Sequence, residues 1–241
     1  MNSFSIGLSF LSSDTQKGTG RKELYSAEAR RILALLDGNP LKDNALSLEG
    51  NGRPYFSDRH ADFNISHSGN IAAVSYISGL EQRTGCDIEL VRSKVNARGI
   101  AELYFSPFEI DYVFASIGKT RDIDNTGSSI GESEVRFFTI WTLKECFLKL
   151  RGLSVFNMRD TPSFISRQGL FTFDTKVFSP VAFYVYELRG ENETYLLSAA
   201  IEGNGGGPPE IRWFSHTRLP ERSVVEIKAA LNPTDTVSPK R

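Results

Sequence analysis

The sequence predicts an α+β fold, because segments with helical spacing of apolar residues are interspersed with short segments of strand-like alternation. Residues 22–36 and 134–151 have the helical spacing, so each half of the chain contains one long helix and several strands. This composition permits two similar α+β lobes. We expect an N-terminal lobe over residues 1–90, a C-terminal lobe over residues 91–232 and a disordered tail over residues 233–241.

In the N-terminal half, apolar residues alternate with polar ones over residues 4–11, which predicts a strand with one buried face. The helix over residues 22–36 ends at Asp-Gly-Asn-Pro, residues 37–40, because glycine and proline terminate helices. Two further strands are expected over residues 71–77 and 86–91.

In the C-terminal half, a helix is expected over residues 97–104. A second helix follows Ser106, with serine as N-cap, proline at the first position and Glu109 at the third. Residues 118–131 are rich in glycine and serine and predict a mobile loop, whereas residues 220–231 predict a short surface helix. Strands are predicted over residues 163–166, 170–174, 181–188, 195–201 and 211–215.

The bulk properties restrict the function classes. The chain has 241 residues, 40% of them hydrophobic, and a net charge of -1, so nucleic-acid binding by bulk attraction is not expected. Its two cysteines form no disulfide framework and are expected to be buried, small apolar side chains. The first residues lack the basic start of a signal peptide, and no apolar run has the length of a membrane span. We therefore expect a cytoplasmic monomer.

Asp87 and Glu89 lie two residues apart on a predicted strand, so their side chains point to the same side. Two carboxylates placed in this way repel each other unless a cation lies between them. The pair predicts a metal site, and the alternative is a solvent-facing strand edge.

Glu145 and Lys149 lie four residues apart on the second long helix and share one face. They are either functional or a surface salt bridge. Lys144 lies within the apolar stripe of the same helix, where a lysine needs an anion or a route to solvent.

His67 lies between Ser66 and Ser68, and it could be a base, a metal ligand, a phosphate donor or a hydrogen-bonded turn residue. A serine hydrolase is not indicated, because no Gly-x-Ser-x-Gly segment is present. Together, three carboxylates, a Ser-His pair and a lysine suit Mg²⁺ holding a phosphate-bearing substrate.

Taken in order, these segments resemble the motifs of the Sfp-type 4′-phosphopantetheinyl transferases. The similar segments are Gly52-Arg53-Pro54-Tyr55-Phe56, Phe63-Asn64-Ile65-Ser66-His67-Ser68-Gly69, Gly85-Cys86-Asp87-Ile88-Glu89 and Trp141-Thr142-Leu143-Lys144-Glu145 with Lys149 and Gly152. Tyr104-Phe105-Ser106 with Glu109 also fits.

The resemblance implies a pseudo-dimer of two similar α+β lobes with the active site in the cleft between them. It also implies a reaction in which a serine of an apo acyl or peptidyl carrier protein attacks coenzyme A. The 4′-phosphopantetheine group is transferred, and adenosine 3′,5′-bisphosphate is released.

By the same resemblance, Mg²⁺ would be bound by Asp87, Glu89 and Glu145, with Glu145 or a metal-bound water as the base and Lys149 offsetting the charge of the leaving group. His67 is the third candidate catalytic residue. The expected contacts with coenzyme A are Arg21, Arg53, Ser66, His67, Lys144 and Lys149.

A carrier-docking surface is expected beside the metal strand, at Leu103, Tyr104, Phe105 and Phe108, because residues 97–114 carry more apolar side chains than one buried stripe needs. Two other functions remain open. One is a Mg²⁺-dependent hydrolase of a pyrophosphate bond, and the other is a degenerate, non-catalytic coenzyme A-binding module.

Overall fold

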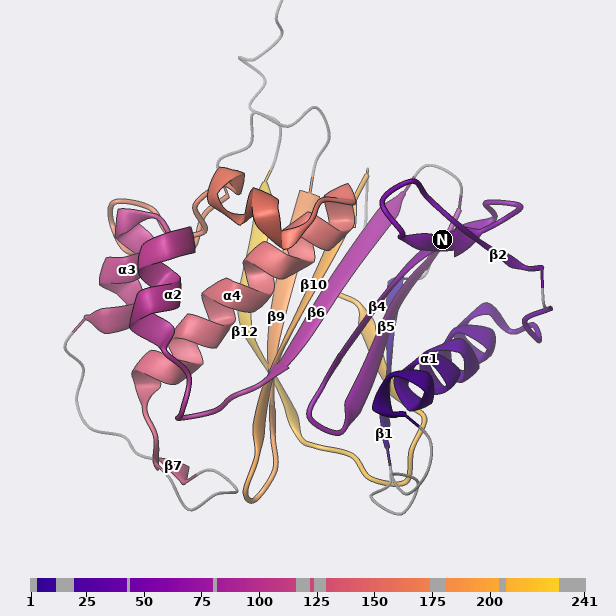
Figure 1. Ribbon diagram of the computed structural model, residues 1–241, viewed down its shortest axis with the longest axis horizontal. Helices are drawn as coiled ribbons and strands as arrows, with labels where there is room; N and C mark the ends of the chain where they lie inside the picture. Colours follow the sequence, from indigo (N-terminus) through magenta and orange to yellow (C-terminus); the bar gives the residue numbers. More distant parts are fainter. Residues whose placement is uncertain are drawn as a thin grey trace, which may run out of the picture.

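The computed structural model describes residues 4–11, 20–42, 44–79, 82–115, 122–123, 129–173, 181–203 and 207–229. These residues form a mixed α+β architecture, as predicted, with two four-stranded sheets and a long helix against each of them (Figure 1). No helix among the described residues is long and apolar enough to cross a membrane.

The first sheet has the strand order β11-β1-β5-β4 and carries α1 (Arg21–Asp37) on one face. β5 is antiparallel to both β1 and β4, and β11 is parallel to β1. The strands are β1 (Phe4–Phe10), β4 (Ala61–Ser68), β5 (Ile71–Ser78) and β11 (Glu210–Trp213). A separate hairpin consists of β2 (Leu46–Leu48) and β3 (Pro54–Phe56).

The second sheet has the order β12-β9-β10-β6, with antiparallel neighbours throughout. It carries the 20-residue helix α4 (Glu132–Arg151), and α2 (Ala97–Tyr104) and α3 (Pro107–Phe114) pack beside α4. A 3-10 helix, η2 (Val155–Asp160), follows α4. The strands are β6 (Arg83–Leu90), β9 (Val181–Arg189), β10 (Thr194–Glu202) and β12 (Glu221–Ala229), and the short strands β7 (Asp122–Ile123) and β8 (Ser129–Ile130) pair separately.

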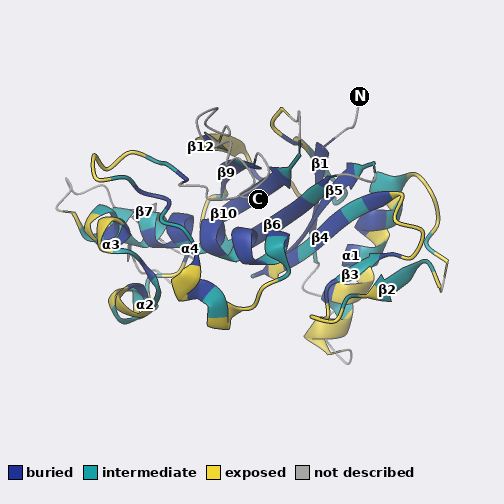
Figure 2. Cartoon of the chain, turned by 90° about the horizontal axis from the view of Figure 1, so that it is seen from above, coloured by how far each residue is buried: buried dark blue, intermediate teal, exposed yellow. Residues whose placement is uncertain are grey.

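The two sheets pack face to face through a shared apolar core, so the layers run helix, sheet, sheet, helix. Alternate residues of β1, such as Ile6 and Leu8, meet Tyr184, Tyr195 and Leu197 of the second sheet. Figure 2 shows that both sheets and α4 are largely buried, while α1 has an exposed outer side. The edge strands β4 and β6 of the two sheets lie side by side between α1 and α4 (Figure 1).

Two expectations about chain organisation were wrong. Residues 221–229 form β12 and not a helix, because their apolar residues reach the core from a strand whose register shifts between Ser223 and Val225. A lobe boundary at residue 90 does not match the sheets, since β6 belongs to the second sheet and β11 returns to the first. Periodicity identifies a strand but not its partner.

The remaining expectations have mixed outcomes. Of the strands expected at residues 163–166 and 170–174, the described part contains only a bridge between Ile165 and Phe171. The tail over residues 233–241 and most of the expected loop over residues 118–131 lie outside the described residues. The helix start at Ser106 is confirmed as a full capping box with Glu109.

Candidate functional site at the junction of the sheets

Asp87 and Lys149 form the centre of the candidate site. Asp87 lies on β6 and is buried, and its Oδ1 accepts hydrogen bonds from Lys149 Nζ at 2.6 Å and from Ser66 Oγ at 2.8 Å. Lys149 Nζ also donates to Ser66 Oγ at 2.9 Å. Burial alone would lower the pKa of Lys149, but Asp87 outweighs it and raises that pKa, so the lysine remains charged. The three side chains come from β6, α4 and β4.

Glu89 and Glu145 complete a cluster of three carboxylates. Glu89 accepts a 2.7 Å hydrogen bond from Ser68 Oγ. Burial, and then the charge of Asp87, raises the pKa of both glutamates, that of Glu145 to about 7. Mutual repulsion of this kind is what a bound cation would relieve.

The position of α4 follows from its sequence and from a close approach to β6. Glutamates in its first turn and Lys149 and Arg151 in its last turn complement the helix dipole, and Gly152 ends it with φ of 66°. A Cβ at Gly85 would lie 2.6 Å from the carbonyl oxygen of Cys146. Glycine at this position therefore allows the helix to bring Glu145 and Lys149 close to the β6 carboxylates.

The carboxylates fit Mg²⁺ in their chemistry, because this ion prefers hard oxygen ligands. Asp87 Oδ2 is buried and finds no hydrogen-bond partner among the described residues, which leaves it free to coordinate. Within the same residues, however, no three acidic, histidine or cysteine side chains already form a metal-binding group. Binding therefore requires side-chain movement.

Arg21, Tyr25 and His67 form a second cluster at the start of α1. The imidazole of His67 is exposed and stacks on the Tyr25 ring, with centroids 4.1 Å apart. Partial burial, and then Lys149, lowers the pKa of His67, so this ring is neutral at pH 7. The Arg21 guanidinium donates to the Tyr25 hydroxyl at 3.0 Å and to the carbonyl of Gly69, and much of it faces solvent.

Lys144 does not lie with these groups. It is 1% exposed, and its Nζ is 3.2 Å from Glu109 Oε2 and 2.7 Å from Thr161 Oγ1. The anion that this lysine needs is therefore Glu109, which also accepts hydrogen bonds from the amides of Ser106 and Phe164. Contact between Lys144 and a coenzyme A phosphate has no support in this closed arrangement. The sequence predicted a helix cap at Glu109 and a fit to the family motif, but not its pairing with Lys144.

Arg53 is also placed differently from expectation. It is 7% exposed, and its two terminal nitrogens bond to Asp62 and to the backbone carbonyls of Phe63, Thr84 and Lys149. These bonds occupy the guanidinium nitrogens of Arg53 that were expected to hold a phosphate.

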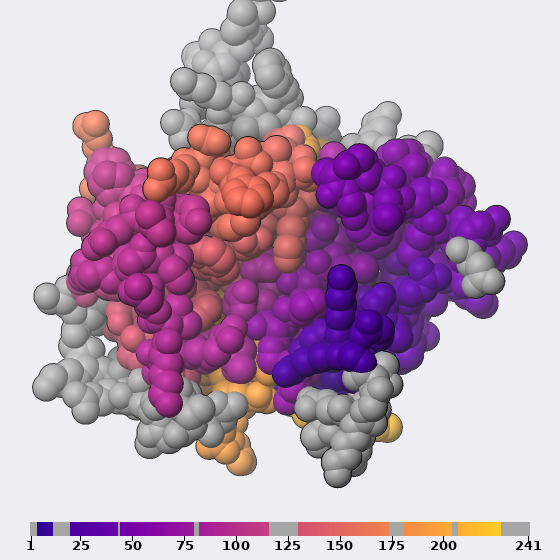
Figure 3. Space-filling model, viewed as in Figure 1, coloured from indigo at the N-terminus to yellow at the C-terminus, as the bar shows by residue number. Residues whose placement is uncertain are grey.

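A cavity of about 230 Å³ opens where the two halves of the site meet, lined by Asn64, Ile65, Lys149, Gly152 and Leu153 among others. In Figure 3 the α4–η2 segment, in orange, and the N-terminal half, in purple, adjoin each other on this face.

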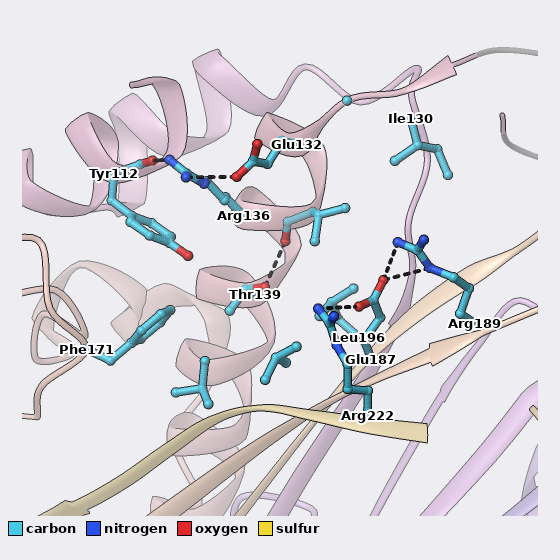
Figure 4. A pocket seen from close by; sticks show the side chains of 14 residues that line it. Tyr112, Ile130, Glu132, Arg136, Thr139, Phe171, Glu187, Arg189, Leu196 and Arg222 are labelled. Carbon is cyan, nitrogen blue, oxygen red and sulfur yellow. Dashed lines mark hydrogen bonds and ion pairs between the residues drawn. The ribbon is translucent and has the colours of Figure 1, made fainter. Parts of the chain in front are cut away.

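Another cavity, of about 330 Å³, lies under the start of α4 (Figure 4). Its charged groups pair with one another, since Arg136 binds Glu132 while Arg189 and Arg222 bind Glu187. The carboxylate cluster does not line this cavity, so it is not the candidate active site.

The profile of the 4′-phosphopantetheinyl transferase superfamily matches residues 83–200. Over these residues the chain is similar to the 4′-phosphopantetheinyl transferase superfamily. The match contains Asp87, Glu89, Glu145 and Lys149, and Arg21 lies outside it.

Curated transferases of this superfamily show moderate similarity. The chain is 32% identical over 108 residues to the transferase AcpT of Escherichia coli (strain K12), covering 44% of this chain and 48% of AcpT. It is 31% identical over 110 residues to the transferase HetI of Nostoc sp., covering 43% and 40%. A putative transferase of Haemophilus influenzae is 29% identical over 122 residues, covering 50% and 46%. The chain thus matches about half the length of these relatives.

Proposed function

We propose that the protein transfers the 4′-phosphopantetheine group of coenzyme A to a serine of an apo acyl or peptidyl carrier protein. The observation that carries this proposal is the junction of Asp87, Lys149 and Ser66 beside Glu89 and Glu145. It combines oxygen ligands for a divalent metal with a charged lysine, which is what transfer of a phosphate-bearing group needs.

In the proposed reaction, the serine oxygen forms a bond to the phosphorus that bears pantetheine. The bond from that phosphorus to the oxygen of the leaving adenosine 3′,5′-bisphosphate breaks. Mg²⁺ held by Asp87, Glu89 and Glu145 supplies charge neutralisation of the pyrophosphate when it is bound.

Two residues have separate roles in this proposal. Glu145 accepts the serine proton, since a carboxylate beside Asp87 and Lys149 at the junction can act as a general base. Lys149 remains protonated and offsets the charge that develops on the leaving phosphate. His67 and Arg21 lie at the mouth of the site, where an exposed guanidinium and a neutral imidazole can donate to phosphate oxygens.

The carrier protein docks on the exposed apolar residues beside the site. Leu103 is 50% exposed and Phe108 is 38% exposed, whereas Phe105 is buried and Tyr104 is half-buried. The proposed surface therefore uses Leu103 and Phe108, and Phe156 of η2, 91% exposed, extends the apolar surface of this half of the molecule.

Incubation with coenzyme A and Mg²⁺, with and without an apo carrier protein, tests the proposal. Intact mass of the carrier reports transfer, and chromatography reports adenosine 3′,5′-bisphosphate. The proposal requires both products only when carrier is present. Release of the bisphosphate without carrier would identify a pyrophosphate-bond hydrolase, and binding of coenzyme A with no product would identify a non-catalytic module.

A further inference from the structure

Four polar side chains of β4 connect the two sheets. Alternate residues of this strand accept hydrogen bonds from alternate backbone amides of β6, each 22 residues further along the chain. The amide-to-acceptor distances are 2.7 Å from Thr84 to Asp62, 3.2 Å from Cys86 to Asn64, 3.3 Å from Ile88 to Ser66 and 3.0 Å from Leu90 to Ser68. We call these four residue pairs the polar seam.

The constant offset of the seam means that β4 and β6 run parallel and in fixed register. The two strands belong to different sheets, so side chains here replace a backbone ladder. The other β6 amides face β10, because amide directions alternate along a strand. A seam of this kind satisfies the edge amides of β6 without a backbone ladder between the two sheets.

Arg53 closes one end of this seam. Its Nη2 donates to Asp62 Oδ2 at 2.6 Å, to the carbonyl of Phe63 on β4 at 3.0 Å and to the carbonyl of Thr84 on β6 at 2.8 Å. Its Nη1 donates to the carbonyl of Lys149 in the last turn of α4. One guanidinium thus joins the three elements that carry the candidate active-site residues.

The opposite end of the seam adjoins the carboxylates. The hydroxyls of Ser66 and Ser68 each accept a hydrogen bond from a β6 amide. Each also donates one to a carboxylate, Ser66 to Asp87 and Ser68 to Glu89. The position of the seam therefore sets the position of both carboxylates.

We propose that Arg53 is a positioning residue that locks the polar seam, and that Ser68 is a positioning residue for Glu89. Arg53 resembles a phosphate-contacting residue in sequence, but a phosphate would have to displace buried partners on three elements to reach its terminal nitrogens. Its remaining nitrogen, Nε, is itself buried. Only the kinetic consequence rests on the proposed function, because the seam can be measured without turnover.

The decisive variant is Arg53→Lys, with exposed Arg59→Lys as the matched control. Lysine keeps the charge but presents one nitrogen to four acceptors on three elements. Hydrogen exchange of the seam amides at Thr84, Cys86, Ile88 and Leu90 should become about tenfold faster. The amides that face β10, such as those of Asp87 and Glu89, should remain protected. Unchanged exchange at the seam amides, or equal acceleration at both sets, overturns the proposal.

Kinetics separate positioning from phosphate binding. A positioning role lowers kcat of Arg53→Lys and leaves the KM for coenzyme A within about twofold of the original value. A rise in that KM with normal seam protection would mean that Arg53 binds the substrate. If the unaltered protein does not transfer phosphopantetheine, the proposed function is wrong. The hydrogen-exchange result still decides whether Arg53 locks the polar seam.

Ser68 provides a milder variant that is independent of Arg53. Ser68→Ala removes the acceptor of the Leu90 amide and the donor to Glu89, so Mg²⁺ affinity measured by calorimetry should fall about tenfold. Ser68→Thr should restore it, because the hydroxyl returns. Ser47→Ala, in the exposed β2–β3 hairpin, is the control. Full Mg²⁺ affinity in Ser68→Ala, or no recovery in Ser68→Thr, contradicts the role assigned to Ser68.

Discussion

The ammonium of Lys149 lies 2.6 Å from one carboxylate oxygen of Asp87, which fixes the last turn of α4 against the middle of β6. The other oxygen of Asp87 is buried without a hydrogen-bond partner among the described residues. One carboxylate thus pairs with the lysine on one side and offers a ligand on the other. In the proposed reaction, this relationship would place Lys149 and the metal next to the same charge.

Replacing Asp87 tests the metal assignment. Asp87→Asn keeps the shape of the side chain but removes its charge, so Mg²⁺ binding measured by calorimetry should be lost and transfer should fall about a hundredfold or more. Glu132→Gln, at the far end of α4, should change neither. Normal transfer by Asp87→Asn at limiting Mg²⁺ would show that this aspartate is not a ligand.

Lys149 and Arg21 should differ in the kinetic constant that they affect. Lys149→Met should mainly lower kcat, since its charge matters most as the leaving group departs. Arg21→Ala should mainly raise the KM for coenzyme A, because an exposed guanidinium at the mouth of the site contributes to binding. Steady-state kinetics over a range of coenzyme A concentrations distinguish the two. Equal changes of both constants in both variants would reject this division.

The buried pair of Lys144 and Glu109 should be important for stability. Lys144→Met leaves the charge of Glu109 without its partner in the interior, which should lower the free energy of unfolding by about 3 to 5 kcal/mol. Adding Glu109→Gln should recover part of this loss. Urea unfolding of the two single variants and the double variant measures the coupling. A loss below about 1 kcal/mol, as for a surface pair, would contradict it.

His60 should make stability depend on pH. Its imidazole contacts both Asp37 and Asp58 at 2.6 Å, and these carboxylates outweigh partial burial and raise its pKa. Because the pKa is higher in the folded than in the unfolded protein, protonated His60 stabilises the fold. This stabilisation is complete below the unfolded-state pKa and is lost as pH rises through the folded-state pKa. As pH rises above the ordinary pKa of histidine, the melting temperature should therefore fall by more in the original protein than in His60→Gln. Parallel melting curves of the two proteins would contradict this prediction.

The proposed docking surface makes a prediction about the carrier protein. Leu103→Asp should raise the KM for carrier and leave the KM for coenzyme A unchanged, because a charge replaces an exposed apolar contact. Leu170→Asp, which is 67% exposed outside the proposed surface, is the matched control. Unaltered carrier kinetics in Leu103→Asp would place the docking surface elsewhere.

Much of the fold and of the site could be predicted from local pattern. Alternation predicted β1, strand-like composition predicted β5 and β10, the spacing of apolar residues predicted α4, and Ser106 with Glu109 predicted a cap that the structure confirms. A further signal was passed over. Over residues 61–66 apolar and polar residues alternate, which predicts the strand that carries the polar seam.

The sequence by itself determined the carboxylates of the site, because residues two apart on a strand or four apart on a helix have fixed relative directions. Only the tertiary structure decided which side chains meet across elements. It paired Lys144 with Glu109, directed Arg53 into the seam and brought Lys149 to Asp87. The ion pairs of Lys144 with Glu109 and of Lys149 with Asp87 join residues 35 and 62 positions apart, and Arg53 reaches carbonyl oxygens 31 and 96 positions away. Their distances depend on how sheets and helices pack, which no local period encodes.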